Sequence, residues 1–194
     1  MTKSIDFYFD FISPYSYLAH KKIEFIKKQK NIEFSYMPVL VGGLHNLEGI
    51  TAPAFIKSKL KHMVSDCDLI AKKHSFDFIW NFKFPLNSLN IMRGYIFINT
   101  TVRDLYLDIM FDAYWKDSLD ISNKKILKTL LKKCNVDSND FFDGVKDLKI
   151  KNELKIATKN AHDKGIFGAP TFVVNDKIFW GQDRLEFALD EYNK

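Results

Sequence analysis

Hydrophobic and polar residues alternate with two different periods along this chain, and the changes of period predict its elements. Apolar residues occupy every second position from Ile5 to Phe11, and aromatic and β-branched residues at this spacing predict a short buried strand. From Tyr15 to Lys30 the apolar residues recur every three or four positions with lysines between them, which predicts a helix packed on that strand. Residues 31–38 return to a period of two and predict a second strand. Because a helix connects the two strands, they should be parallel.

The middle of the chain is expected to be helical almost throughout. Residues 39–48 contain Gly42-Gly43 and lose their periodicity, so we expect a loop across the mouth of the sheet. Residues 53–162 then carry helical patterns, interrupted by an irregular aromatic stretch over residues 76–86. The helices are expected at about residues 53–73, from Asn87 or Ser88, around residues 102–113, and from Ser122, Ser138 and Leu148, the last ending near His162.

The C-terminal part returns to strands. Thr171–Asn175 and Lys177–Trp180 predict two strands around an Asn-Asp turn, and Gly181–Tyr192 predicts a closing amphipathic helix. The order β-α-β, helices, β-β-α predicts an α/β protein with a thioredoxin-like core and a large all-helical insertion. In this interpretation residues 1–52 and 163–194 form the core, and residues 53–162 form the insertion.

The size and charge of the chain favour a globular protein that does not bind nucleic acid. With 194 residues, 46% of them hydrophobic, the chain can bury the core of one domain. The 29 basic and 24 acidic side chains give a net charge of +5. The lysines are scattered as on solvated helix faces, so a nucleic-acid-binding surface is not indicated.

Targeting signals, thiols and histidines narrow the interpretation further. The sequence shows neither a secretory leader nor an apolar run near 18 residues, so we expect a cytoplasmic protein with no membrane contact. Cys67 and Cys134 form no C-x-x-C pair, which predicts reduced thiols and excludes dithiol exchange within this chain. The five histidines show no close metal-ligand spacing, so no metal site is expected.

The junction at Ser13-Pro14 is the strongest candidate for chemistry. Ser13 fits a helix N-cap, and Pro14 fits the first helical position, where its missing N–H costs nothing. A helix N-terminus directs unpaired amides and partial positive charge at one point, which suits an anion such as a thiolate. The alternative is that Ser13 acts only as an N-cap, which stabilises a helix by about 1 kcal/mol without any chemistry.

Five local patterns, in order along the chain, resemble one enzyme family. They are FDFISPYSYLA, PVLVGG, FPLNSL, GIFGAPTFVV and WGQDRLEFAL. The chain resembles the 2-hydroxychromene-2-carboxylate isomerases, a family similar to the kappa-class glutathione transferases and to DsbA-like oxidoreductases. The resemblance implies an enzyme that uses glutathione as cofactor, acts on a small aromatic substrate and is commonly a homodimer.

The resemblance also implies roles for particular residues. Ser13 stands where redox relatives have a nucleophilic Cys, and would assist the thiol of bound glutathione. Ala169, followed by a cis Pro170, would offer backbone hydrogen bonds to the cysteinyl part of glutathione. Gln182 and Asp183 fall where the family holds the γ-glutamyl end.

The substrate side of the site departs from the family pattern. Tyr15, His45 and Asn46 are the candidate substrate contacts, but Asn46 and Gly49-Ile50 stand where family members often have a Lys and a Gly-Asn pair. Loss of a cation there should weaken recognition of a carboxylate. Two other functions stay open at this point: a kappa-like glutathione transferase or peroxidase, and a non-catalytic thioredoxin-like binding module.

Overall fold

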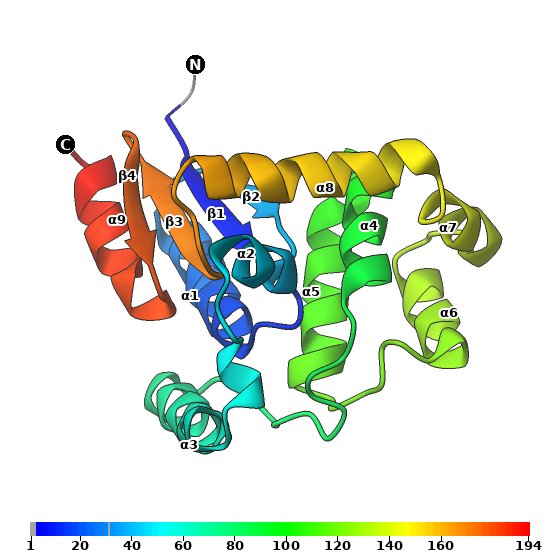
Figure 1. Cartoon of the computed structure of the whole chain (residues 1–194), viewed down its shortest axis with the longest axis horizontal. Coiled ribbons are helices and arrows are strands. Elements are labelled where there is room, and N and C mark those ends of the chain that lie inside the picture. The colour runs from blue at the N-terminus through cyan, green and yellow to red at the C-terminus, as the bar shows by residue number, and fades with distance from the viewer. Residues whose placement is uncertain (1–2, 31) are drawn as a thin grey trace.

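A computed structural model describes residues 3–30 and 32–194 of the chain and contains a four-stranded sheet. The strand order is β2-β1-β3-β4, with β1 (Ile5–Phe9), β2 (Phe34–Pro38), β3 (Thr171–Val174) and β4 (Lys177–Trp180) (Figure 1). β1 and β2 are parallel as predicted, whereas β3 runs antiparallel to both β1 and β4. The predicted second strand began at Asn31, which lies outside the described residues.

Helices cover the sheet and fill the segment between β2 and β3, which confirms the α/β thioredoxin-like fold class (Figure 1). The irregular stretch expected over residues 76–86 is also present. The α-helices are α1 (Pro14–Gln29), α2 (Val41–Glu48), α3 (Lys57–His74), α4 (Leu89–Phe97), α5 (Arg103–Trp115), α6 (Lys124–Lys133), α7 (Ser138–Gly144), α8 (Leu148–Asp163) and α9 (Leu185–Tyr192), and the 3-10 turns are η1 (Pro53–Phe55), η2 (Thr100–Val102) and η3 (Gln182–Arg184).

One predicted loop is a helix. Residues 41–48 form α2, although Gly42-Gly43 lowers the intrinsic helix propensity of this segment. Tertiary contacts compensate for this: Leu40 N–H donates to Thr158 Oγ1 of α8 at 3.0 Å, and α2 packs against α8. A Cβ at position 43 would lie 3.1 Å from the Thr158 methyl group, so glycine permits this close approach.

Aromatic side chains form the core between the sheet and the helices. Phe11, at the end of the strand segment, lies 4.7 Å from Phe111 of α5 between ring centroids. Trp115 Nε1–H donates to the carbonyl of Phe11 at 2.9 Å. Both α5 side chains are fully buried in the same cluster as the strand residues. The core therefore continues from the sheet into the helical segment and fixes α5 against the start of α1.

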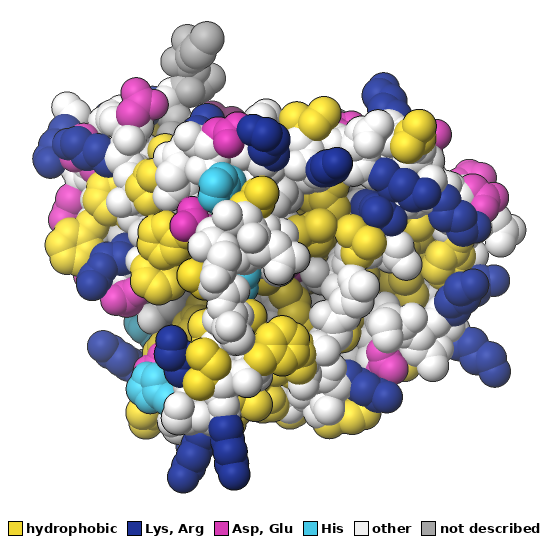
Figure 2. Space-filling view, viewed as in Figure 1, with side chains coloured by type: hydrophobic (Ala, Val, Ile, Leu, Met, Phe, Trp, Pro, Cys, Tyr) yellow, Lys and Arg dark blue, Asp and Glu magenta, His cyan; other side chains and the backbone are white. Residues whose placement is uncertain are grey.

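The surface matches the scattered charge of the sequence. In Figure 2 the lysine and arginine side chains are spread over several elements of the face shown, with acidic side chains between them. Every helix within residues 3–30 and 32–194 is too short or too polar to span a bilayer.

Candidate active site

Ser13 caps α1 as the sequence predicts. Its backbone is extended, with φ −82° and ψ 115°, and its Oγ accepts a hydrogen bond from Ser16 N–H at 3.1 Å. Pro14 occupies the first turn, where no backbone donor is needed. Ser13 is 7% exposed, so this cap residue is buried.

The Ser13 hydroxyl also contacts the loop before β3. Ser13 Oγ donates to the backbone carbonyl of Ala169 at 2.9 Å, across 156 positions of sequence. The Ala169–Pro170 peptide is cis, as the resemblance implies. Within the described part of the chain, the Ala169 N–H donates to no protein group. The structure thus brings together Ser13, Ala169 and Pro170, leaving a backbone donor of the loop free for a ligand.

The loop before β3 is held in place by contacts with Thr171 and Trp180. Thr171 Oγ1 donates to the Gly168 carbonyl at 2.7 Å. A Cβ at Gly168 would lie 2.8 Å from the indole nitrogen of Trp180, so glycine allows β4 to pack directly against the loop. These contacts fix the backbone edge that faces Ser13.

Asp10 is a site residue that sequence reasoning missed. This carboxylate is 1% exposed and accepts hydrogen bonds from Ile12 N–H at 3.1 Å and Val41 N–H at 2.9 Å. Ser88 at the start of α4 donates to the same carboxylate, and the Asp10 carbonyl accepts from Ser13 N–H at 3.0 Å. Asp10 therefore joins the Ser13 turn to the first residues of α2 and α4.

Burial raises the pKa of Asp10 to about 6, although its three hydrogen bonds favour the ionised form. The available signal in the sequence was an acidic residue within the apolar run FYFDFI. A carboxylate at such a position is costly to bury unless it has partners, which makes it a candidate for a local organising role.

Gln182 and Asp183 lie in η3 and differ in environment. Gln182 is buried, and its side-chain carbonyl accepts a hydrogen bond from Lys22 Nζ of α1. Asp183 is exposed and lies 3.3 Å from the guanidinium of Arg184. Gly181, with φ 111°, allows the turn that places the Asp183 carboxylate against the backbone.

Lys22 is a second residue that sequence reasoning missed. Burial lowers the pKa of Lys22, while the charges of Glu186 and Asp183 act in the opposite direction. A partly buried ammonium therefore contacts Gln182 of η3, next in sequence to the exposed Asp183, where the resemblance implies a γ-glutamyl group.

The three candidate substrate residues are not equivalent. Tyr15 Oη donates to Asp66 of α3 at 2.8 Å, so its hydroxyl is engaged in linking α1 to α3. His45 is half-buried on α2, and burial lowers its pKa. Asn46 is exposed on the same helix. Since Val41 N–H donates to Asp10, the start of α2 is tied to the Ser13 turn, and His45 and Asn46 lie further along this helix.

The protein's own thiols are unsuited to supply a nucleophile. Cys67 and Cys134 are both free and buried. Burial raises the pKa of the Cys67 thiol far above its usual range and that of Cys134 to about 11. Both thiols are therefore protonated at neutral pH and unsuited to act as nucleophiles.

Comparisons with known proteins show the family to which the chain belongs. The model of the DsbA-like thioredoxin domain family matches residues 4–193. The 2-hydroxychromene-2-carboxylate isomerase of Sphingobium xenophagum is 29% identical over 194 residues, which cover 99% of this chain and 98% of the relative. Glutathione S-transferase kappa 1 of Caenorhabditis elegans is 24% identical over 96% of this chain and 89% of its own length.

A solved structure gives the same result for the fold. A 2-hydroxychromene-2-carboxylate isomerase superimposes with a TM-score of 0.88 at 22% sequence identity, covering 96% of this chain and 92% of that one. The resemblance inferred from the five sequence patterns is therefore confirmed over nearly the whole chain. The relatives named as isomerases are enzymes, in agreement with the expectation that this chain is one.

Proposed function

Since the chain belongs to the DsbA-like thioredoxin domain family and has isomerases among its relatives, we propose that it is a glutathione-dependent isomerase. The observation that carries the proposal is the contact of the Ser13 hydroxyl, at the N-terminus of α1, with the carbonyl of Ala169 before a cis proline. A ligand bound there would meet the Ser13 hydroxyl, the N-terminus of α1 and the backbone of Ala169.

Glutathione can enter this site by exchanging one hydrogen bond for another. The cysteinyl part of the tripeptide pairs with the backbone of Ala169, its N–H donating to the Ala169 carbonyl and its carbonyl accepting from the Ala169 N–H. The Ser13 hydroxyl, which donates to that carbonyl in the free protein at 2.9 Å, is then released to donate to the sulfur. After this exchange the Ala169 carbonyl, the Ala169 N–H and the Ser13 hydroxyl each have a hydrogen-bond partner, as buried polar groups require.

The same point favours the ionised form of the thiol. An unperturbed thiol has a pKa of about 8.5 and is mostly protonated at neutral pH. The partial positive charge at the start of α1 and the hydroxyl of Ser13 both stabilise a thiolate, which lowers its pKa. No base beside Ser13 is required, because Ser13 acts as a hydrogen-bond donor and not as a nucleophile.

The γ-glutamyl end of glutathione carries an ammonium and a carboxylate. The exposed Asp183 carboxylate can pair with the ammonium, and Lys22 can pair with the carboxylate when it leaves Gln182. The Gln182 backbone carbonyl, 3.4 Å from Lys22 Nζ, can keep Lys22 near η3 when the side-chain contact is lost. Lys22 adds one residue to the set that the sequence suggests for this subsite.

The reaction that this arrangement supports is reversible thiol addition. Opening of the ring breaks its hemiketal C–O bond and gives a phenol and a ketone conjugated to the carbon–carbon double bond. The thiolate then adds to the double-bond carbon beside the aromatic ring, and the electron pair of the double bond moves into an enolate, which permits rotation about the former double bond. The enolate electron pair afterwards re-forms the double bond and breaks the C–S bond. Departure of the thiolate restores glutathione, so the reaction has no net oxidation or reduction. We expect an aromatic substrate of the chromene type, contacted by α2 through His45 and Asn46.

The decisive test compares two serines of the same helix. Ser13→Ala removes the hydroxyl that donates to sulfur, and we expect a loss of turnover of about 100-fold, typical of removing one preorganised donor. Ser16→Ala is the matched control, because the buried Ser16 hydroxyl has no hydrogen-bond partner among the described residues. Isomerisation of 2-hydroxychromene-2-carboxylate with added glutathione, followed by absorbance, gives turnover, and thermal unfolding shows that both variants fold. Equal turnover of Ser13→Ala and wild type would exclude the proposal.

The two alternatives have separate signatures. The relatives named as kappa-class transferases favour conjugation as the second candidate, and a stable conjugate of a model electrophile without isomer formation would select it. Absence of glutathione binding by calorimetry, with the fold intact, would select a non-catalytic binding module.

Two expectations from the resemblance remain part of the proposal. We expect a homodimer, which light scattering after size exclusion can test. We also expect the protein to work in the cytoplasm, because reduced glutathione is maintained there.

A further inference from the structure

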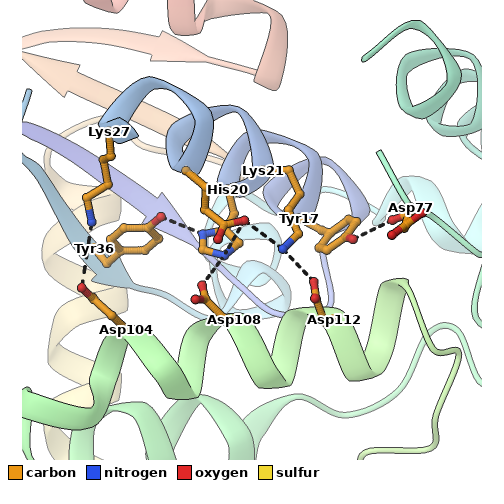
Figure 3. A network of polar contacts seen from close by, with 10 residues as sticks. Tyr17, His20, Lys21, Lys27, Tyr36, Asp77, Asp104, Asp108 and Asp112 are labelled. Carbon is orange, nitrogen blue, oxygen red and sulfur yellow. Dashed lines mark hydrogen bonds and ion pairs between the residues drawn. The ribbon is translucent and has the colours of Figure 1, made fainter. Parts of the chain in front are cut away.

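The flank of α1 that faces α5 carries a polar network separate from Ser13 (Figure 3). Three aspartates of α5, spaced four residues apart, face this flank, and each has a partner on α1. Asp104 lies 4.0 Å from Lys27, Asp108 lies 3.0 Å from His20, and Asp112 lies 2.7 Å from Lys21. The middle partner is a histidine, whereas the outer two are lysines.

Three side chains at this point present metal-binding atoms to one another. His20 Nε2 lies 3.0 Å from Asp108 Oδ1 and 3.9 Å from Glu24 Oε2, and the three atoms all lie within 4.8 Å of one another. His20 and Glu24 are four residues apart on α1, so they share one helix face. Ligands of a tetrahedral zinc ion are separated by about 3.4 Å, as metal–ligand distances of about 2.1 Å require. Small side-chain rotations are sufficient to reach this geometry.

The histidine is oriented by its surroundings. Its side chain is 3% exposed, and its ring stacks on Phe111 with centroids 5.0 Å apart. His20 Nδ1 lies 2.7 Å from Tyr36 Oη, and burial holds the pKa of Tyr36 well above its usual range, so the phenol stays neutral. Binding of a metal ion at Nε2 would place the ring proton on Nδ1, where the Tyr36 oxygen can accept it, and the ion would lie between Nε2 and the two carboxylates. Metal-binding histidines are held by such a contact at their second nitrogen.

The site has room and an approach from solvent. A cavity of about 320 Å³ adjoins the three donors and is lined also by Lys27, Lys28, Tyr36, Asp104 and Leu107. Asp108 is 45% exposed in its side chain, and Glu24 is 28% exposed. The cavity can hold the water molecules that would complete the coordination of an ion.

Lys21 is the competing cation, and the structure provides it with another partner. Its Nζ lies 2.8 Å from Glu24 Oε2 and 2.7 Å from Asp112 Oδ1. If Glu24 turns to an ion, Lys21 keeps Asp112. The network can therefore accept a cation without leaving a lysine unpaired.

From this geometry we propose that His20, Glu24 and Asp108 form a binding site for a divalent transition-metal ion such as Zn²⁺. One imidazole and two carboxylates with open positions for water are a ligand set that suits Zn²⁺ and its neighbours in the first transition row. The ion would join α1 to α5 and stabilise the helix that carries Ser13 at its start. The inference does not depend on the proposed glutathione chemistry, because none of the three residues belongs to that site.

The matched test uses two aspartates of α5 that both line the cavity. The full chain is stripped with a chelator and titrated with ZnCl₂ by calorimetry, and thermal unfolding is followed with and without Zn²⁺. Asp108→Asn removes a ligand and should weaken binding at least about tenfold, the lower end of the loss seen for residues that support metal ligands. Asp104→Asn makes the same change one turn away, at an 83% exposed carboxylate outside the set of three, and should leave binding unchanged. Zn²⁺ should raise the unfolding temperature of wild type and Asp104→Asn, but not of Asp108→Asn.

Cobalt provides an independent measurement. Co²⁺ bound to His20 and two carboxylates should give visible absorption bands that shift or disappear in Glu24→Gln. Wild type that shows no saturable Zn²⁺ binding, or Asp108→Asn that binds as tightly as Asp104→Asn, would overturn the proposal. If Asp108→Asn binds Zn²⁺ as tightly as Asp104→Asn, the bound zinc is held by other histidines of the chain.

Discussion

The start of α1 and the flank of α1 lie on one helix but are built from different interactions. At the start, Ser13 and Asp10 contact backbone amides and carbonyls, and the site offers an anion partial positive charge and hydrogen-bond donors. On the flank, His20 and its neighbours contact charged side chains of α5. Backbone geometry at a helix N-terminus favours an anionic ligand, whereas a set of carboxylates around an imidazole favours a cation. One helix can thus serve two kinds of ligand at separate places.

The largest expected effect comes from the residue that contacts both regions. Phe111 is fully buried and touches Phe11, two residues before Ser13, and His20 on the flank. Phe111→Ala should destabilise the protein by about 3–5 kcal/mol, the cost of emptying a buried aromatic site, and should also weaken Zn²⁺ binding by releasing His20. Urea unfolding measures the first effect and calorimetry the second.

Phe187→Ala is the control for this substitution, since Phe187 is 55% exposed on α9. We expect its free energy of unfolding to stay within about 0.5 kcal/mol of wild type. If Phe111→Ala lowers the free energy of unfolding but leaves the Zn²⁺ affinity intact, packing against Phe111 is not what positions His20 for the ion.

The second effect concerns the region at the start of α1 and is a dependence of the free energy of unfolding on pH. The pKa of Asp10 is raised from 3.8 to about 6 in the folded protein, so the folded state binds more protons than the unfolded state between these values. The free energy of unfolding should therefore fall as pH rises from about 4 to about 6, by at most about 3 kcal/mol from this group, at 1.36 kcal/mol per pKa unit. Below and above this window Asp10 contributes no slope.

Asp10→Asn should flatten this part of the stability profile, measured by urea unfolding at a series of pH values. Asp6→Asn, in β1 and only partly buried, should leave most of the slope in place. An unchanged slope in Asp10→Asn would show that Asp10 is not the group that titrates.

The smallest expected effect concerns glutathione affinity. Lys22→Met removes the ammonium proposed to hold the γ-glutamyl carboxylate, and should raise the KM for glutathione about tenfold, since an ion pair of partly buried groups contributes on the order of 1–2 kcal/mol. Turnover at saturating glutathione should stay near wild type, because Lys22 is not proposed to touch the reacting sulfur.

Lys28→Met, on an exposed part of the same helix, is the matched control and should leave the KM unchanged. A fall in turnover without a change in KM would instead place Lys22 among the residues that organise Ser13.

Some features of the fold and the site could be predicted because their causes are local. The period of apolar residues is a local property, and it located the strands and most helices, including α1 with Ser13 as its cap. The loop predicted over residues 39–48 was wrong, because α2 is stabilised by contacts with Thr158 and Asp10 that no local pattern contains. Asp10 was missed for the same reason, since its donors come from three separate segments.

By itself the sequence determined most of the elements, the absence of a C-x-x-C pair and the position of a serine at a helix start, because these depend on neighbours in the chain. Only the tertiary structure decided that Ser13 faces Ala169 across 156 positions, that Lys22 reaches Gln182, and that His20 meets Asp108. The physical reason is that hydrogen bonds and ion pairs depend on distances in space. Those distances are set by how α1 packs against α5, η3 and the loop before β3, which no pattern of neighbouring residues specifies.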